Sequence, residues 1–312
     1  MKRILVSLLL LLLSLAGTCL GQETWPPDGA RILGLDPVVP LRWEGNPGDR
    51  YLLQVYASEK EVVSKEVQGN SARVQLWPGS YYRWQVARLE KGGSYTLISP
   101  RSFTLSKEVE FKFSGNDGKD GKSGSAPRDY GRSGGSGAPG ANGESGGDVT
   151  VVFEPFSNDV LNLSVNGPYN NQKYFLLAGT PIYITTRGGH GGAGGDGGHG
   201  AQGLFYVQAN RGFVQSASFP PGIGGDGGPG GEGGRGGNVT VRALGVPNPP
   251  TVHVDNQGGQ GGRGGAAGAG GAAAIIPNFY RGGIPAAFQG PAPPGRPGPN
   301  GRPGRPGQVF NR

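Results

Sequence analysis

The stretch "GGHGGAGGDGGHGAQG", residues 188–203, places glycine at every third position, and its first four triplets carry a second glycine beside the first. A period of three residues is that of the polyproline II type of helix, which forms no internal hydrogen bonds. Its backbone groups therefore need partners in water or on neighbouring helices. Two glycines per triplet allow neighbours on two of the three sides, which predicts a bundle of polyglycine II helices.

The remainder of residues 114–312 contains both double-glycine and single-glycine triplets. Double glycines recur in "GGDGGPGGEGGRGGN" (224–238) and "GGQGGRGGAAGAGGA" (258–272). Single glycines, as in collagen, recur from Gly115, over 131–146 and in "GRPGPNGRPGRPG" (295–307). We expect a collagen-like linker over 107–147 and a basic, Pro/Gly-rich collagen-like tail over 290–312.

The third residues of the double-glycine triplets are predicted to form solvent-facing ridges. In the first two double-glycine segments they are His190, Ala193, Asp196, His199, Gln202, Asp226, Pro229, Glu232, Arg235 and Asn238. His190 and His199 are nine residues apart, roughly 28 Å at about 3.1 Å per residue, so they cannot share a metal ion.

The spacers between the glycine segments are apolar and strand-like. Ordering glycine costs on the order of 1 to 2 kcal/mol per residue, more than a net hydrogen bond returns, so the spacers must supply buried area. Several spacers look like β-hairpins, with "ANRG" and "GVPNPP" as turns. Hairpins would make successive glycine segments antiparallel rods of about 45 Å. We therefore predict a polyglycine II bundle with interspersed β-hairpins over 148–289.

Residues 34–106 have conventional composition. Six or seven short alternating runs, separated by Gly, Pro, Asn or charged turns, predict an antiparallel all-β sandwich. Residues 22–33 are expected to be an N-terminal linker. Trp25 and Trp77 fall outside the inward alternation, and we interpret them as surface contacts.

The run "LWPGSYYRWQV" resembles the fibronectin type III pattern of Leu, Pro-Gly, Tyr and alternating apolar residues. In that family the tyrosine forms a corner, in which its hydroxyl bonds the backbone a few residues upstream. The resemblance implies a fibronectin type III-like sandwich, with the following side chains in its core: Trp43, Leu76, Tyr82, Trp84 and Val86.

The N-terminus predicts export. Lys2 and Arg3 precede an apolar run that is too short to span a bilayer, as in a secretory signal peptide over residues 1–21. Cys19 is the only cysteine, and "LAGTC" leaves lipidation at Cys19 as an alternative to cleavage after Gly21. The expected location is extracellular, either secreted or attached to a bacterial outer surface, and no later segment has transmembrane length.

Catalytic and cofactor sites are not expected. No Ser/His/Asp set or pair of carboxylates stands in a strand-end context, and the glycine runs do not follow the strand-to-helix order of a phosphate loop. Arg187, Arg235, Arg263 and Arg281 stand in RGG triplets, as in nucleic-acid-binding tails, but the export signal and the strict triplet spacing argue against that interpretation. Six arginines and no acidic residue follow Asp255, so the tail is a candidate for holding an anionic polysaccharide.

The glycine-rich part resembles the polyglycine II bundles of phage long-tail-fibre tip adhesins, whose loops between rods recognise receptors. The resemblance points to recognition by Tyr206, Asn210, Arg211, Phe213, Asn248, Phe279, Tyr280 and Arg281, although the aromatic residues among them can equally cap the bundle. The function hypothesis is a non-enzymatic adhesion or extracellular structural protein whose partner is a cell-surface or extracellular glycan or protein, with possible self-association. The alternatives are a subunit of an envelope appendage, sheath or filament, and ice binding.

Overall fold

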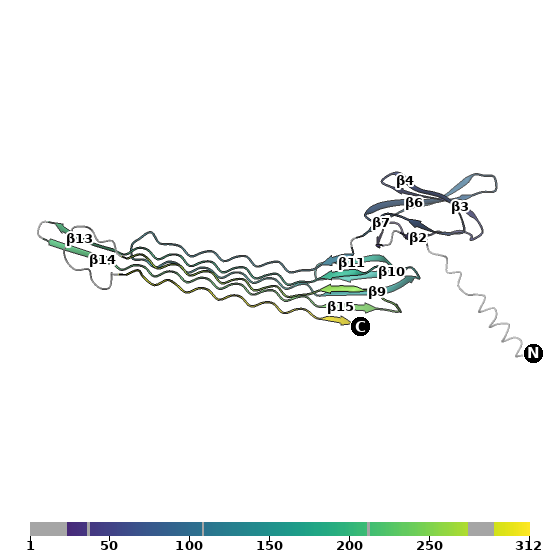
Figure 1. Ribbon diagram of the computed structural model, residues 1–312. Coiled ribbons are helices and arrows are strands. Elements are labelled where there is room, and N and C mark those ends of the chain that lie inside the picture. The colour runs from purple at the N-terminus through teal and green to yellow at the C-terminus, as the bar shows by residue number, and fades with distance from the viewer. Residues whose placement is uncertain (1–23, 36–37, 108, 211–212, 274–289) are drawn as a thin grey trace, which may run out of the picture.

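The computed structural model describes residues 24–35, 38–107, 109–210, 213–273 and 290–312 (Figure 1). Every regular element among these residues is a β-strand. Figure 1 shows strands gathered at one end, long extended segments leaving them side by side, and a single hairpin at the far end. The predicted signal peptide, its lipidation alternative Cys19 and the cleavage site lie outside the described residues.

The N-terminal part is a β-sandwich. One face is the pair β2 (Val38–Arg42) and β5 (Ser71–Gln75). The other is formed by β1 (Ala30–Leu33), β7 (Tyr95–Ser106), β6 (Ser80–Leu89), β3 (Arg50–Ala57) and β4 (Lys60–Gln68), in that order. Inward residues of both sheets share one apolar core.

The core side chains expected from the fibronectin-like pattern are buried. Trp43 has no exposed surface, and Leu76, Tyr82, Trp84 and Val86 are each 2% exposed. The Tyr82 hydroxyl donates a hydrogen bond of 2.7 Å to the Trp77 carbonyl oxygen, five residues upstream. This contact is the tyrosine corner that the motif implies.

The sandwich begins earlier than residue 34, which corrects the expected linker over 22–33. Trp25 is 3% exposed rather than a surface contact, and its backbone pairs with Arg42. Its ring lies edge-on to Phe175, with the ring centroids 6.2 Å apart. Sequence alternation missed this burial because the covering ring comes from a distant strand. Trp77, by contrast, is 74% exposed.

The sandwich and the second group of strands share one sheet. Strand β1 pairs in parallel with β7 on one side and with β11 (Asn171–Leu177) on the other. The sheet continues through β10 (Val160–Asn166), β9 (Val149–Ser157), β15 (Val239–Ala243) and β17 (Val309–Asn311). A small parallel sheet packs near it and contains β8 (Glu110–Lys112), β12 (Ile182–Thr185) and β16 (Val252–Asp255).

Six extended segments leave these sheets, and together we call them the glycine array. They are segments I (115–125), II (132–147), III (187–203), IV (222–238), V (256–272) and VI (292–308). Segments I, III and V follow β8, β12 and β16, whereas segments II, IV and VI lead into β9, β15 and β17. The array is therefore a continuation of two β-layers, and consecutive segments run in opposite directions.

Hydrogen bonds join the segments at every third residue. Segment III donates from Gly191 and Gly194 to segment V, and from the next residues, Gly192 and Gly195, to segment II. Segments II, III and IV each donate in this way to the previous segment and to the one after next, at 2.7 to 3.1 Å. The segments thus form two layers, with I, III and V in one and II, IV and VI in the other.

With one exception, glycine stands at the positions where a Cβ atom would meet the backbone of a neighbouring segment. A Cβ atom on Gly191 would lie 2.0 Å from the Gly231 carbonyl oxygen of segment IV, and one on Gly192 would lie 2.1 Å from the Lys119 carbonyl oxygen of segment I. The first glycine of a triplet faces the next segment, and the second faces a preceding one. Segments III, IV and V each have a next segment and a segment two before, and they carry double glycines. Nothing in the structure explains why Ala267 is tolerated in one such row.

This rule corrects two expected domains. The predicted linker over 107–147 contains segments I and II, and the predicted tail over 290–312 is segment VI followed by β17. Segments I, II and VI lie at the edges of the array, so each needs only one glycine per triplet. Their collagen-like appearance reflects the number of their neighbours.

The ridge residues do more than face solvent, which is a second correction. The Asp196 carboxylate accepts the Ala266 N–H at 2.7 Å, and Nδ1 of His190 and of His199 accepts the N–H of Gln260 and of Ala269. These N–H groups belong to the non-glycine residues of segment V, whereas the hydrogen bonds that this segment donates to neighbouring backbones come from glycine N–H groups. Polar ridge side chains therefore complete the hydrogen bonding of the neighbouring segment.

Candidate functional site

The distal end of the glycine array carries three of the four expected recognition residues that the structure describes. Tyr206 and Asn210 belong to β13 (Leu204–Asn210) and Phe213 to β14 (Phe213–Phe219), which form the far hairpin (Figure 1). Arg211 lies outside the described residues, as do Phe279, Tyr280 and Arg281.

Asn248 does not belong to this group. It follows β15 at the opposite end of the array, where it lines a groove with Phe156, Asn158, Pro247 and Pro249. The candidate recognition residues are thus divided between the two ends of the molecule. The spacer that contains Asn248 was expected to be a hairpin with "GVPNPP" as its turn. Instead it connects β15 and β16, which belong to different sheets.

The distal end also contains exposed apolar side chains that sequence reasoning missed. Tyr130 is 47% exposed, Phe219 44% and Ile223 50%. The backbone that carries them comes from neighbouring segments, because a Cβ atom on Gly131 would be 3.0 Å from the Phe219 Cβ, and Gly134 donates to the Ile223 carbonyl oxygen. The available signal was "APRDYGR" (126–132), which interrupts the triplets and so marks a turn.

A second groove lies where the array meets the sheets. Phe113, Asn116, Glu144 and Gln172 line it, together with Tyr169, which is 97% exposed in the turn between β10 and β11. The Asn116 side chain donates to Glu144 at 2.7 Å. The groove therefore combines one free aromatic ring with amide and carboxylate groups.

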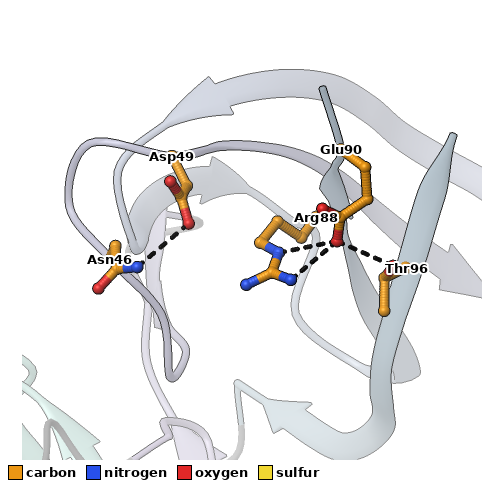
Figure 2. A network of polar contacts seen from close by, with 5 residues as sticks. All are labelled: Asn46, Asp49, Arg88, Glu90 and Thr96. Carbon is orange, nitrogen blue, oxygen red and sulfur yellow. Dashed lines mark hydrogen bonds and ion pairs between the residues drawn. The ribbon is translucent and has the colours of Figure 1, made fainter. Parts of the chain in front are cut away.

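A polar network occupies one end of the sandwich (Figure 2). Glu90 accepts hydrogen bonds from Arg88 at 2.8 and 3.1 Å and from Thr96 at 3.0 Å. The Arg88 hydrogen bond, followed by that of Thr96, lowers the pKa of Glu90. Figure 2 shows Asn46 and Asp49 bonded to each other in the nearby turn. These groups are exposed and already paired, as in a surface network that orders a turn.

Metal-binding geometry is absent from the described ranges: no group of three or more His, Cys, Asp or Glu side chains there could hold an ion. His190 and His199 each serve the backbone of segment V, as described above. In the part of the chain that the structure covers, no helix has the length and apolar character needed to cross a membrane.

Comparisons with known proteins provide weak likenesses of fold. No protein-family model and no curated protein sequence matches this chain. Chicken CNTN1 FN1–FN3 domains are similar at 14% identity, with 62% of this chain and 84% of that chain covered and a TM-score of 0.20. Extracellular domains 3–5 of Drosophila OTK are similar at 8% identity, with coverage of 59% and 68% and a TM-score of 0.19. Likenesses at these scores carry no conclusion about function.

Proposed function

We propose that this protein is a non-enzymatic extracellular adhesion or structural protein, in which the glycine array is a stiff spacer that presents its distal end to a surface. The observation that supports this function is the position of the β13–β14 hairpin (Figure 1). It lies at the far end of six mutually bonded segments, away from the sandwich. A spacer of this kind holds a contact surface clear of whatever anchors the other end.

The proposed architecture is a fibronectin type III-like sandwich followed by a polyglycine II bundle. The tyrosine corner at Tyr82 supports the first part. The second is supported by the three-residue period of hydrogen bonds between segments, since a helix of this type has no internal bonds. This part of the proposal rests on the sequence, which resembles the phage long-tail-fibre tip adhesins in its glycine triplets and in the placement of apolar spacers between them.

The proposed location is outside the cell, and the proposed partner is a cell-surface or extracellular glycan or protein. The apolar run after Lys2 and Arg3 supports export. Tyr130, Phe219 and Ile223 are exposed on neighbouring stretches of backbone at the distal end, and exposed apolar groups there support contact with a partner.

The test compares binding of fluorescently labelled full-length protein to intact cells of the source organism and to a printed glycan array. One variant replaces Tyr206, Asn210, Arg211 and Phe213 with serine. Its matched control replaces Asn46, Asn158, Tyr169 and the exposed Lys60 with serine at the other end. We expect at least a tenfold loss of binding in the distal variant and less than a twofold change in the control. Equal binding by both variants, or no binding by the parent protein, would overturn the proposal.

A further inference from the structure

Segment VI holds three arginines on one ridge of the array. Arg296, Arg302 and Arg305 each directly follow the glycine that packs inward, so they occupy equivalent positions. Their carbonyl oxygens accept hydrogen bonds from Gly227, Gly233 and Gly236 of segment IV at 2.8 to 2.9 Å. All three are exposed. The segment expected as a basic collagen-like tail therefore places these three arginines along one line of fixed backbone.

Segment IV adds a fourth arginine beside this line. Because Gly236 bonds to the Arg305 carbonyl oxygen, Arg235 and Arg305 occupy the same level on adjacent ridges. The only carboxylate on the segment IV ridge at the level of this cluster is Glu232, next to Arg302. Within the described residues no ion pair involves Arg235, Arg302 or Arg305.

The next carboxylate on the segment IV ridge, Asp226, lies outside this cluster, at the level of Arg296. Asp226 accepts the backbone N–H of Arg296 at 2.7 Å. Near the sheets, Asp148 accepts the N–H of Asn238, whose own side chain accepts from Arg235 at 3.3 Å. Three guanidinium groups thus face one carboxylate over two triplets of the array, which leaves a local excess of positive charge.

We propose that Arg235, Arg302 and Arg305, extended by Arg296, bind a linear acidic polysaccharide that lies along the array. Successive triplets rise by about 9 Å, so the arginines of segment VI stand one or two triplets apart along an extended partner. Guanidinium groups form paired hydrogen bonds with carboxylate or sulfate oxygens. The ridges of segments IV and VI carry no aromatic residue, whereas single-stranded nucleic acids are held largely by base stacking on aromatic rings.

Prolines keep this ridge in place. Pro297, Pro303 and Pro306 stand beside the arginines on the outer edge of segment VI, and proline fixes φ near −65°. The guanidinium groups therefore project from a backbone with little freedom to lose on binding. The proposal rests on the proposed extracellular function for its partner class but uses a surface remote from the distal hairpin.

Binding to fluorescently labelled polygalacturonate tests this proposal with the full chain. The variant Arg235→Gln/Arg302→Gln/Arg305→Gln should bind at least tenfold more weakly than the parent at 50 mM salt. Its control, Lys91→Gln/Lys119→Gln/Lys122→Gln, removes the same charge elsewhere and should change binding less than twofold. Parent binding should weaken as salt rises to 300 mM, because ions screen exposed charges. Circular dichroism melting verifies that both variants fold.

If the arginine and lysine variants lose the same amount of polygalacturonate binding, the proposed role of the arginines is wrong. The same holds if the parent binds neutral dextran as tightly as polygalacturonate. Tighter binding of single-stranded DNA than of polygalacturonate would overturn the partner class. The serine variant of the distal hairpin should keep its affinity for polygalacturonate. The two proposals are therefore tested separately. Cell binding by the distal variant tests the proposed function, and polygalacturonate binding by the arginine variant tests this inference.

Discussion

Inside the glycine array, adding a single methyl group to a glycine would bring it into collision with the backbone of a neighbouring segment. Gly231 donates to the Gly192 carbonyl oxygen at 2.8 Å, and a Cβ atom on it would lie 2.0 Å from the Ala141 carbonyl oxygen. The obstacle is backbone on a neighbouring segment, so no side chain can rotate away. Glycine here is required for the approach of two segments rather than for an unusual φ angle.

Gly231→Ala should therefore destabilise the protein strongly. Overpacking costs about 1 to 3 kcal/mol. Each separated hydrogen bond adds about 0.5 to 1.5 kcal/mol. We expect the free energy of unfolding to fall by about 2 to 4 kcal/mol in urea titrations followed by circular dichroism. Gly290→Ala is the control, because among the described residues no atom beyond its chain neighbours lies within 4 Å of its Cβ position, and the variant's stability should be unchanged or slightly higher. Equal effects of the two substitutions would contradict this packing.

The Arg187–Asp255 ion pair links segment III to the end of β16. Arg187 Nε donates to Asp255 Oδ2 at 2.7 Å, and this hydrogen bond lowers the pKa of the Asp255 carboxyl. A carboxyl whose pKa is lower in the folded state stabilises the fold above its unfolded pKa. That contribution is lost as the pH falls through the folded pKa.

Asp255→Asn should accordingly lower the melting temperature at pH 7, with the difference from the parent shrinking below about pH 4. Melting curves between pH 7 and pH 2 measure this convergence. Asp129→Asn, in the highly exposed pair with Arg132, is the matched control and should barely change the curve. A constant difference between Asp255→Asn and the parent across the whole range would show that the charge of Asp255 is not responsible.

At the scale of elements, the spacing of the glycines predicted ordered segments and not a flexible linker. Double glycines predicted segments III, IV and V, and alternating runs predicted the strands of the sandwich. The single-glycine segments were misassigned because collagen-like composition does not reveal that an edge segment lacks a neighbour on one side. The strand β1 and Trp25 were missed because their partners, β11 and Phe175, are more than a hundred residues away. Tyr130 and Phe219 were missed because local patterns do not show which turns meet.

Removing segment VI tests its place in the array. A chain that ends at residue 289 loses the acceptors of Gly227, Gly230, Gly233 and Gly236. It also uncovers the first glycines of segment V. We expect a melting temperature several degrees lower and concentration-dependent association through the uncovered edge. Removing only residues 309–312 should have a much smaller effect, because the array remains complete. If the two truncations behave alike, residues 292–308 are a tail rather than part of the array.

For the whole molecule, both edges of the array are closed to further segments. Segment I carries Asn116, Lys119 and Lys122 where an inner segment carries its second glycine, and their side chains keep another backbone from approaching. Segment VI carries Pro294, Pro297, Pro303 and Pro306 where an inner segment donates hydrogen bonds, and proline has no N–H group. Bulky or proline residues at an open edge prevent edge-to-edge growth, as they do in β-sheets.

This closure predicts that the protein does not associate laterally through the array, and that the barrier can be removed. Replacing Asn116, Lys119 and Lys122 with glycine gives segment I the double-glycine pattern of segment III, so a second copy can pack against it. Sedimentation velocity at increasing concentration should show a monomer for the parent and larger species for the triple variant. The control Asn116→Ser/Lys119→Ser/Lys122→Ser removes the same charges but keeps Cβ atoms, and it should stay monomeric. Association of the serine variant would assign the barrier to charge repulsion, whereas association of the parent would favour a filament subunit over a solitary spacer.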